Sequence, residues 1–321
     1  MSSIGVQLQR MNMYQSSSEI EDKAVTIRPS STALFGIDSA DRYKTVIEQQ
    51  QGNKSAYDFT IYKSESLLNG FFTRIGLTEV VFPYYIPNIN NKTNTIIMIY
   101  DGGAEVTITL TNGFYSPTAL ASELQAQLIT GGAAAGTTVT YTALGNFVID
   151  VTAGHDIMLL PSVDGPNDWS LFDLLGGTDD WYGVGGQTLI SKITRARYTE
   201  YIDIVCSQLT YNQDLKDGSS DPIVRDMLAR VYVETENDQI APVWNGTKVI
   251  VPVPETIPGC YPFTIYRQFK TPKMIMWNKN QPIGNLKIEL YDSRGNPLTM
   301  GSDLPDSAAP DWRITLLVSE N

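Results

Sequence analysis

Residues 71–87 read FFTRIGLTEVVFPYYIP, and this stretch decides how the chain is interpreted. It is long, aromatic and rich in β-branched residues, a composition that favours a β-strand over a helix. Pro83 and Pro87 indicate an edge, a bulge or the exit from a strand, because proline has no N–H to donate to a strand ladder. The stretch therefore predicts a long strand that leaves its sheet near residue 87.

Strand-like runs separated by turn residues lie on both sides of this stretch. The earlier ones are ALFGIDSADRY (33–43) and YDFTIY (57–62). The later ones occupy 196–209, 227–234, 247–254, 261–269, 273–277, 285–292 and 311–319. About eight or nine strands with this spacing are typical of a β-sandwich, and eight strands in two sheets is the jelly-roll number. We predict an all-β protein with a single jelly-roll β-sandwich.

One unit departs from this pattern, because it contains a well-marked helix in NGFYSPTALASELQAQLIT (112–130). Ser116 suits the N-cap, Pro117 suits the first helical position, and Gly131 suits the end. The apolar stripe of the helix consists of Leu120, Ala121, Leu124 and Leu128. A hairpin around Asp-Gly-Gly precedes the helix and a second hairpin around Gly145 follows it, which predicts a compact strand–helix subdomain.

These patterns divide the chain as follows. The jelly-roll domain comprises residues 33–92 and 182–321, and the inserted strand–helix subdomain comprises 93–181. Residues 1–32 are polar and rich in serine and glutamine, and we predict that they form an N-terminal arm. Two interpretations of the arm stay open, a disordered tail or a segment that orders against a neighbouring subunit.

Composition limits the classes of function. The formal charge is −12 and the pI about 4.6, which argues against wrapping nucleic acid, since that requires a cationic face. Charged residues are 18% of the chain, below the usual ~25%, which suits a surface that meets other protein. We expect no signal peptide and no transmembrane segment, and hence a soluble protein made in the cytosol.

The sequence offers little catalytic chemistry. The single histidine, His155, lies between a glycine and an aspartate and is predicted to sit in a turn without a catalytic task. Cys206 and Cys260 are predicted to be small buried hydrophobes. The acidic turn KDGSSD (216–221) lacks a calcium-loop pattern, and we interpret it, like Asp179-Asp180, as solvated. We predict no enzyme activity, no cofactor and no metal.

Two groups of residues are candidates for contacts. In IDSADR (37–42), the simpler interpretation is a turn whose Asp and Ser bond to backbone while the arginine pairs locally. The functional alternative has Ser39, Asp41 and Arg42 contacting a neighbouring subunit. Trp169 and Trp181 are candidates for stacking on a sugar, although we favour them as core anchors of a short helix.

The order of several motifs resembles a family. It consists of Ser39, Asp41 and Arg42 before a core strand, then Ile86-Pro87-Asn88 at the end of a long strand, then Gly113-Phe114-Tyr115 opening a helix with spaced leucines. In this order they resemble the penton or minor capsid proteins of virophages, of Polinton-type elements and of related large eukaryotic DNA viruses. The resemblance covers residues 34–180 well and 196–319 more loosely.

The resemblance implies a capsid subunit with a single jelly roll that forms a homopentamer at the icosahedral vertices. Its expected partners are copies of itself and the major capsid protein, and its expected location is the virion, assembled inside the host cell. One alternative is a minor capsid or cement protein that lies beneath or between the major capsomers. Another is a lectin-like, receptor-binding jelly-roll module.

Overall fold

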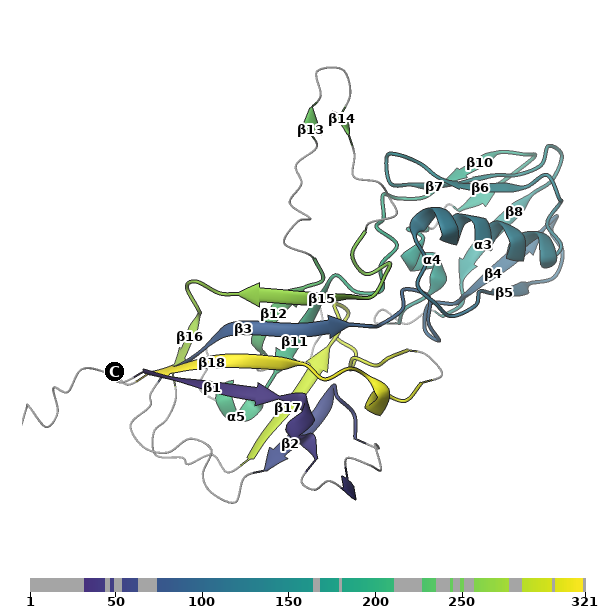
Figure 1. Cartoon of the computed structure of the whole chain (residues 1–321). Coiled ribbons are helices and arrows are strands. Elements are labelled where there is room, and N and C mark those ends of the chain that lie inside the picture. The colour runs from purple at the N-terminus through teal and green to yellow at the C-terminus, as the bar shows by residue number, and fades with distance from the viewer. Residues whose placement is uncertain are drawn as a thin grey trace, which may run out of the picture.

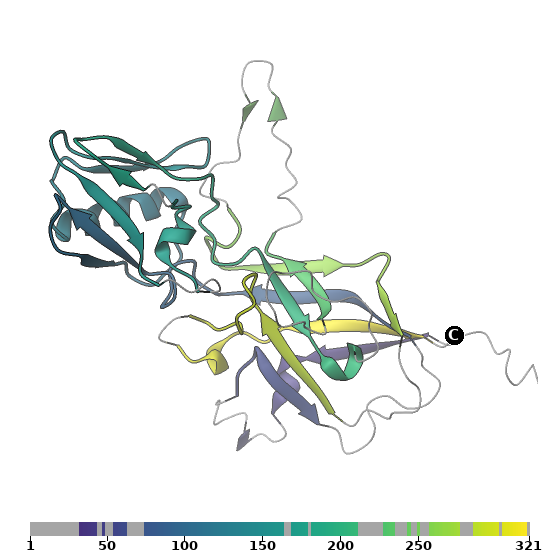
Figure 2. The same ribbon diagram turned by 180° about the vertical axis from the view of Figure 1, so that it is seen from behind.

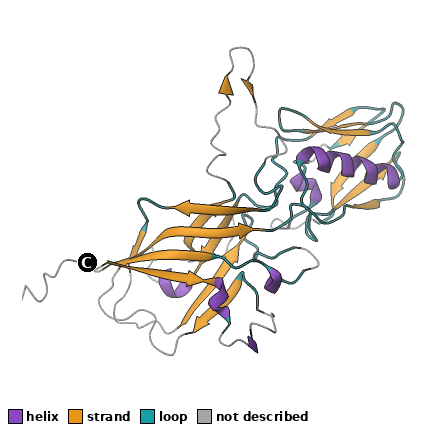
Figure 3. Ribbon diagram, in the orientation of Figure 1, coloured by secondary structure: helices purple, strands orange, loops and turns teal. Residues whose placement is uncertain are grey.

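The structure is a computed structural model, and its chain forms a β-sandwich with a second, smaller unit beside one end of it (Figures 1 and 2). It describes residues 32–43, 47–48, 54–62, 74–163, 168–178, 181–210, 227–234, 243–244, 249–250, 257–276, 285–301 and 304–319. Strands predominate, and the longest helix belongs to the smaller unit (Figure 3).

Two antiparallel sheets make up the sandwich. The first has the order β1 (Thr32–Asp38), β18 (Arg313–Ser319), β3 (Arg74–Tyr84) and β15 (Phe263–Gln268), with β16 (Met274–Met276) also pairing with β3. The second has the order β12 (Met227–Tyr232), β11 (Tyr201–Val205), β17 (Asn285–Tyr291) and β2 (Asp58–Tyr62). Numbered in chain order, the eight main strands run 1-8-3-6 in one sheet and 5-4-7-2 in the other. This interleaved order is that of a jelly roll, so the predicted fold is confirmed.

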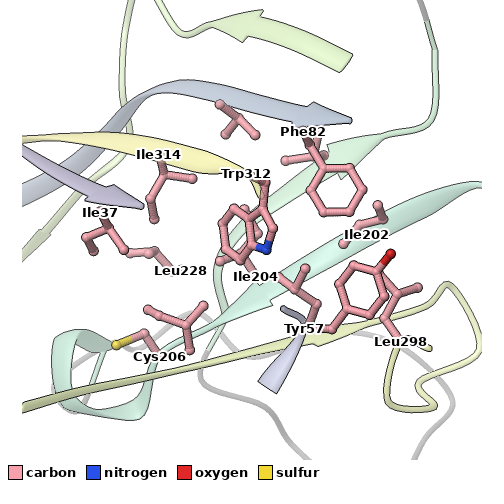
Figure 4. Packing of buried hydrophobic residues seen from close by; sticks show 14 of the residues in the cluster. Ile37, Tyr57, Phe82, Ile202, Ile204, Cys206, Leu228, Leu298, Trp312 and Ile314 are labelled. Atoms are coloured by element: carbon pink, nitrogen blue, oxygen red, sulfur yellow. The ribbon is translucent and has the colours of Figure 1, made fainter. Parts of the chain in front are cut away.

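The sandwich core forms because the strands alternate between buried and partly exposed side chains. Trp312 joins the two sheets, since its ring lies 5.8 Å from the ring of Phe59 on β2 and 5.9 Å from that of Phe82 on β3 (Figure 4). Its indole N–H donates to the backbone oxygen of Ala56 at 2.7 Å, so the buried ring leaves no polar atom unsatisfied. Figure 4 shows Tyr57, Ile202 and Ile204 packed around it.

The smaller unit is inserted between the third and fourth strands of the jelly roll. One of its sheets has the order β5 (Val106–Thr109), β4 (Thr95–Tyr100), β8 (Ile157–Pro161) and β9 (Tyr182–Gly183). The other has the order β10 (Thr188–Ile190), β7 (Phe147–Asp150) and β6 (Thr138–Tyr141). Both sheets share one hydrophobic core with the helices α3 (Pro117–Thr130) and α4 (Leu171–Leu174).

The predicted helix is confirmed in detail. Ser116 is the N-cap of α3, and its hydroxyl accepts a hydrogen bond from the Ala119 N–H at 3.2 Å. Pro117 is the first helical residue, and Gly131 is the C-cap. The buried residues include the whole predicted stripe of Leu120, Ala121, Leu124 and Leu128.

The boundary of the insertion is wider than the predicted 93–181. At its end, β9 and β10 pair with β8 and β7, and Leu189 and Ala196 belong to the core of the inserted unit. At its start, Ile89 belongs to that core and forms a bridge with Gly113. The unit therefore extends over about 89–196. The predicted arm, 1–32, lies outside the described residues except for Thr32, which begins β1.

Candidate functional site at the junction of the two units

The chain passes between the two units twice, and Asn88 ties the two passages together. Its side-chain N–H₂ donates to the backbone oxygen of Tyr115 at 2.9 Å and to that of Ala196 at 2.8 Å. Its side-chain oxygen accepts from the Tyr115 N–H at 2.9 Å. Asn88 is completely buried, so these bonds are not in competition with water. One amide thus connects the outgoing chain, the start of α3 and the returning chain.

The turn that follows Asn88 is also held by side chains. The Thr93 hydroxyl donates to the backbone oxygen of Asn88 at 2.7 Å. The side-chain amide of Asn90 donates to the backbone oxygen of Pro87 at 2.9 Å. The Asn91 N–H donates to the oxygen of Gly301, a residue of the jelly roll, at 2.7 Å. The outgoing passage is therefore hydrogen-bonded to the sandwich at Gly301.

A second contact between the units centres on Asp292, at the end of β17. One of its carboxylate oxygens accepts from the indole N–H of Trp169 at 2.9 Å and from the Tyr198 hydroxyl at 3.0 Å. The other accepts from the backbone N–H groups of Arg294 and Asn296, both at 2.9 Å. Asp292 is 1% exposed, and these four donors replace the water that a carboxylate otherwise requires.

Arg294 completes this contact from the same turn. Its guanidinium lies 4.1 Å from the centre of the Trp169 ring, pairs with Asp173 of α4 at 3.2 Å and donates to the Asp168 oxygen. The stacking and the ion pair together hold the segment before α4 against the sandwich. The turn at 292–296 thus forms the second contact between the sandwich and the inserted unit.

Buried polar groups line the junction between the Asn88 contact and the contact made by the turn at 292–296. Burial raises the pKa of the Tyr84 and Tyr198 hydroxyls, and it raises the pKa of the Cys260 thiol to about 12. Cys260 therefore stays a thiol at neutral pH and is no nucleophile. Arg197 donates to the Val233 oxygen at 2.6 Å across the same region. Within the described residues, the Tyr84 hydroxyl and the Arg197 Nε are buried here without a hydrogen-bond partner.

Two of the three predicted contact residues, Arg42 and Ser39, form hydrogen bonds within the subunit itself. Arg42 is 4% exposed, pairs with Asp311 and donates to the backbone oxygens of Ser39 at 2.7 Å and Lys54 at 3.1 Å. Ser39 is buried, and its hydroxyl donates to Asp311 at 3.1 Å. This is the local pairing that the simpler interpretation described. Asp41 is exposed, and a contact of this turn with a neighbouring subunit stays a prediction.

The two tryptophans lie in different places, and only Trp181 is in the core around the short helix; Trp169 packs against the sandwich core. Trp181 is 2% exposed, and its ring meets that of Phe172 edge-on at 5.4 Å in the core of the inserted unit. Trp169 is partly buried, covered by Arg294 and by the Tyr198 ring at 5.1 Å. Stacking of either ring on a sugar stays a prediction.

The remaining predicted residues lie as follows. His155 is in a turn, where its ring stacks on Tyr100 and its Nδ1 lies 2.7 Å from the Asp101 carboxylate. Cys206 and Cys260 are buried free thiols, as predicted. Residues 216–221 and 179–180 lie outside the described part of the chain. Among described residues, no group of three or more His, Cys, Asp or Glu side chains could hold a metal ion.

Asp292 and Arg294 were missed as functional residues, because DSRGN indicates only a turn. Asn88 and Tyr115 appear in the motif order, but their contact spans 27 residues of sequence and leaves no local pattern. The structure brings together the two motifs that contain them, Ile86-Pro87-Asn88 and Gly113-Phe114-Tyr115.

Comparison with known proteins gives structural likeness alone. No family model matches the chain, and no curated protein matches it. It is similar to the mavirus penton protein in a crystal structure, with 11% identity, a TM-score of 0.48 and coverage of 91% of this chain and 100% of that chain. It is also similar to a chain of the Sputnik virophage solved by cryo-EM, with 11% identity, a TM-score of 0.43 and coverage of 91% and 98%. The strand order described above establishes the jelly roll without these likenesses.

Within the described part of the chain, no helix combines the length and the apolar character needed to cross a membrane.

Proposed function

We propose that this protein is a structural subunit of a viral capsid and that it forms a homopentamer at the icosahedral vertices. The observation that carries the proposal is the jelly roll, with its strand order 1-8-3-6 and 5-4-7-2 and a unit inserted between the third and fourth strands. Jelly rolls of this kind build capsids because a rigid sandwich offers broad sides for packing around a symmetry axis.

Two further observations support a mechanical role. The motifs whose order resembles the virophage penton and minor capsid family supply Asn88 and Tyr115, which meet at the joint between the units. At that joint Asn88, Trp169 and Tyr198 form hydrogen bonds within the chain. On this proposal the partners are copies of the chain and the major capsid protein, the location is the virion, and there is neither catalysis nor readout of nucleic acid.

The test is the mass of the purified chain in solution, measured by light scattering coupled to size exclusion over a range of concentrations. A pentamer of 35.5 kDa chains supports the vertex role. A monomer or a different oligomer that still co-assembles with the major capsid protein would move the chain to the minor capsid or cement role. A monomer that joins no capsid would contradict the proposal as a whole.

A further inference from the structure

Strand β1 lies at the edge of the first sheet. It pairs with β18 along its whole length, and among the described strands none pairs with its other side. Open edges and flat faces beside them readily accept another chain, so proteins usually cover or charge them. The outer face beside this edge carries Leu34, Gly36, Thr315 and Leu317, which we call the β1 strip.

Gly36 is the unusual residue of the β1 strip. Alternation along the strand turns Ile37 into the core and Gly36 outward, and Gly36 has no positive φ that would require glycine. A Cβ built on Gly36 meets no atom within 4 Å, and the residue is exposed. By contrast, a Cβ on Gly76 of β3 would crowd the Cβ of Pro272 at 3.1 Å and the backbone oxygen of Lys273 at 3.2 Å, so packing within the fold favours that glycine.

A glycine inside a strand weakens the strand, so its presence calls for a reason. Neither backbone conformation nor packing among the described residues supplies one for Gly36. The remaining reason is the close approach of another backbone, which a side chain would obstruct. Leu34, two residues earlier on the same face, is 70% exposed and would gain burial from the same approach.

Charge indicates what approaches. The β1 strip has no charged side chain, and the five strands of its sheet carry a small excess of positive charge. Their charged residues are Arg74, Arg267 and Arg313 against Asp38 and Glu79. The whole chain carries −12, so a second copy brings mostly negative surface to a neutral or slightly positive face.

We infer that the β1 strip is a contact surface for a second copy of this chain, with Gly36 admitting the neighbour's backbone and Leu34 packed against it. The inference rests on the proposed homo-oligomer and adds to it the surface that one subunit uses. It also separates the functions of the two glycines, since Gly76 serves the fold and Gly36 serves assembly.

The decisive variant is Gly36→Val, because it should leave the fold intact and disrupt the assembly. Valine suits an exposed strand with open space, so the far-ultraviolet circular dichroism spectrum should match that of the wild type, while the loss of association lowers the apparent Tm. The same side chain should shift the population from oligomer to monomer, measured by light scattering at equal concentration. The matched control is Thr264→Val, an exposed position on β15 at the opposite edge of the same sheet, which should assemble as the wild type does.

Circular dichroism shows whether the Gly36→Val protein folds. If it does not fold, a second pair of variants tests the same contact. Leu34→Glu should also release monomers, whereas Thr264→Glu should not. An oligomeric Gly36→Val or Leu34→Glu protein beside an oligomeric wild type overturns the contact but leaves the pentamer standing. A monomeric wild type overturns the pentamer and the contact together.

Discussion

At the scale of single residues, the joint depends on buried side chains that form hydrogen bonds between segments far apart in the sequence. The Asn88 amide is the clearest case, because it donates twice and accepts once between three segments of the chain. A buried amide of this kind is specific to asparagine, since the isosteric carboxylate has no proton to donate. Sequence reasoning could name Asn88 from its motif, but not its partner Ala196, which is 108 residues away.

We predict that Asn88→Asp lowers the free energy of unfolding by about 3 kcal/mol or more. The change would place a negative charge against the oxygens of Tyr115 and Ala196 without water to solvate it. Urea unfolding at pH 7 measures the effect. The control is Asn91→Asp, because Asn91 is exposed and accepts a hydrogen bond from Asn112 through an oxygen that aspartate retains. Equal stability of the two variants would contradict the role given to Asn88.

At the scale of elements, turn and capping residues in the sequence predicted the hairpin and the helix that depend on local interactions. The hairpin of β4 and β5 followed from Asp-Gly-Gly, and α3 followed from its cap, its proline and its leucine spacing. The strands β9 and β10 could not be predicted, because runs of two and three residues have no measurable period. Their pairing with β8 and β7 depends on the core around Leu189. The inserted unit therefore ends at about residue 196 and not at the predicted 181.

We expect Ser116→Ala to lower the stability of the protein by about 1 kcal/mol, since the Ala119 N–H loses its acceptor at the start of α3. Ser122→Ala on the same helix is the control. Ser122 is exposed, its hydroxyl donates to the Thr118 oxygen at 3.1 Å, and alanine is the better helix former there. Thermal unfolding followed by circular dichroism compares the two. A cap that contributes nothing would leave Ser116→Ala no less stable than Ser122→Ala.

At the scale of the whole molecule, two hydrophobic cores are joined by polar contacts. The sandwich core, which includes Tyr198 and against which Trp169 packs, and the core of the inserted unit are separate clusters. Asp292 bonds to Trp169, and Arg294 pairs with Asp173 of α4 in the inserted unit. The jelly roll was predictable because its eight strands are long and well separated by turns. The orientation of the inserted unit was not, since it depends on a turn meeting a segment 123 residues earlier.

Replacement of Asp292 by alanine should loosen this orientation while both cores stay folded. Four donors would lose their acceptor, and we expect a loss of about 3 kcal/mol in stability. Small-angle X-ray scattering should show a larger radius of gyration with an unchanged far-ultraviolet circular dichroism spectrum. Asp150→Ala is the control, because Asp150 is exposed and its carboxylate bonds to Thr188 within the inserted unit. An Asp292→Ala protein with the scattering profile of the wild type would refute this role.

The hydrogen bond of 2.8 Å from Asn88 to Ala196 also means that the insertion begins and ends at nearly the same point. Closing the jelly roll therefore costs about the same chain entropy whatever folds between those residues, because that cost depends on how far apart the ends are held. The inserted unit could therefore be replaced, in evolution or by design, by another folded domain whose two ends lie close together. The sandwich and the inserted unit are then free to change at different rates.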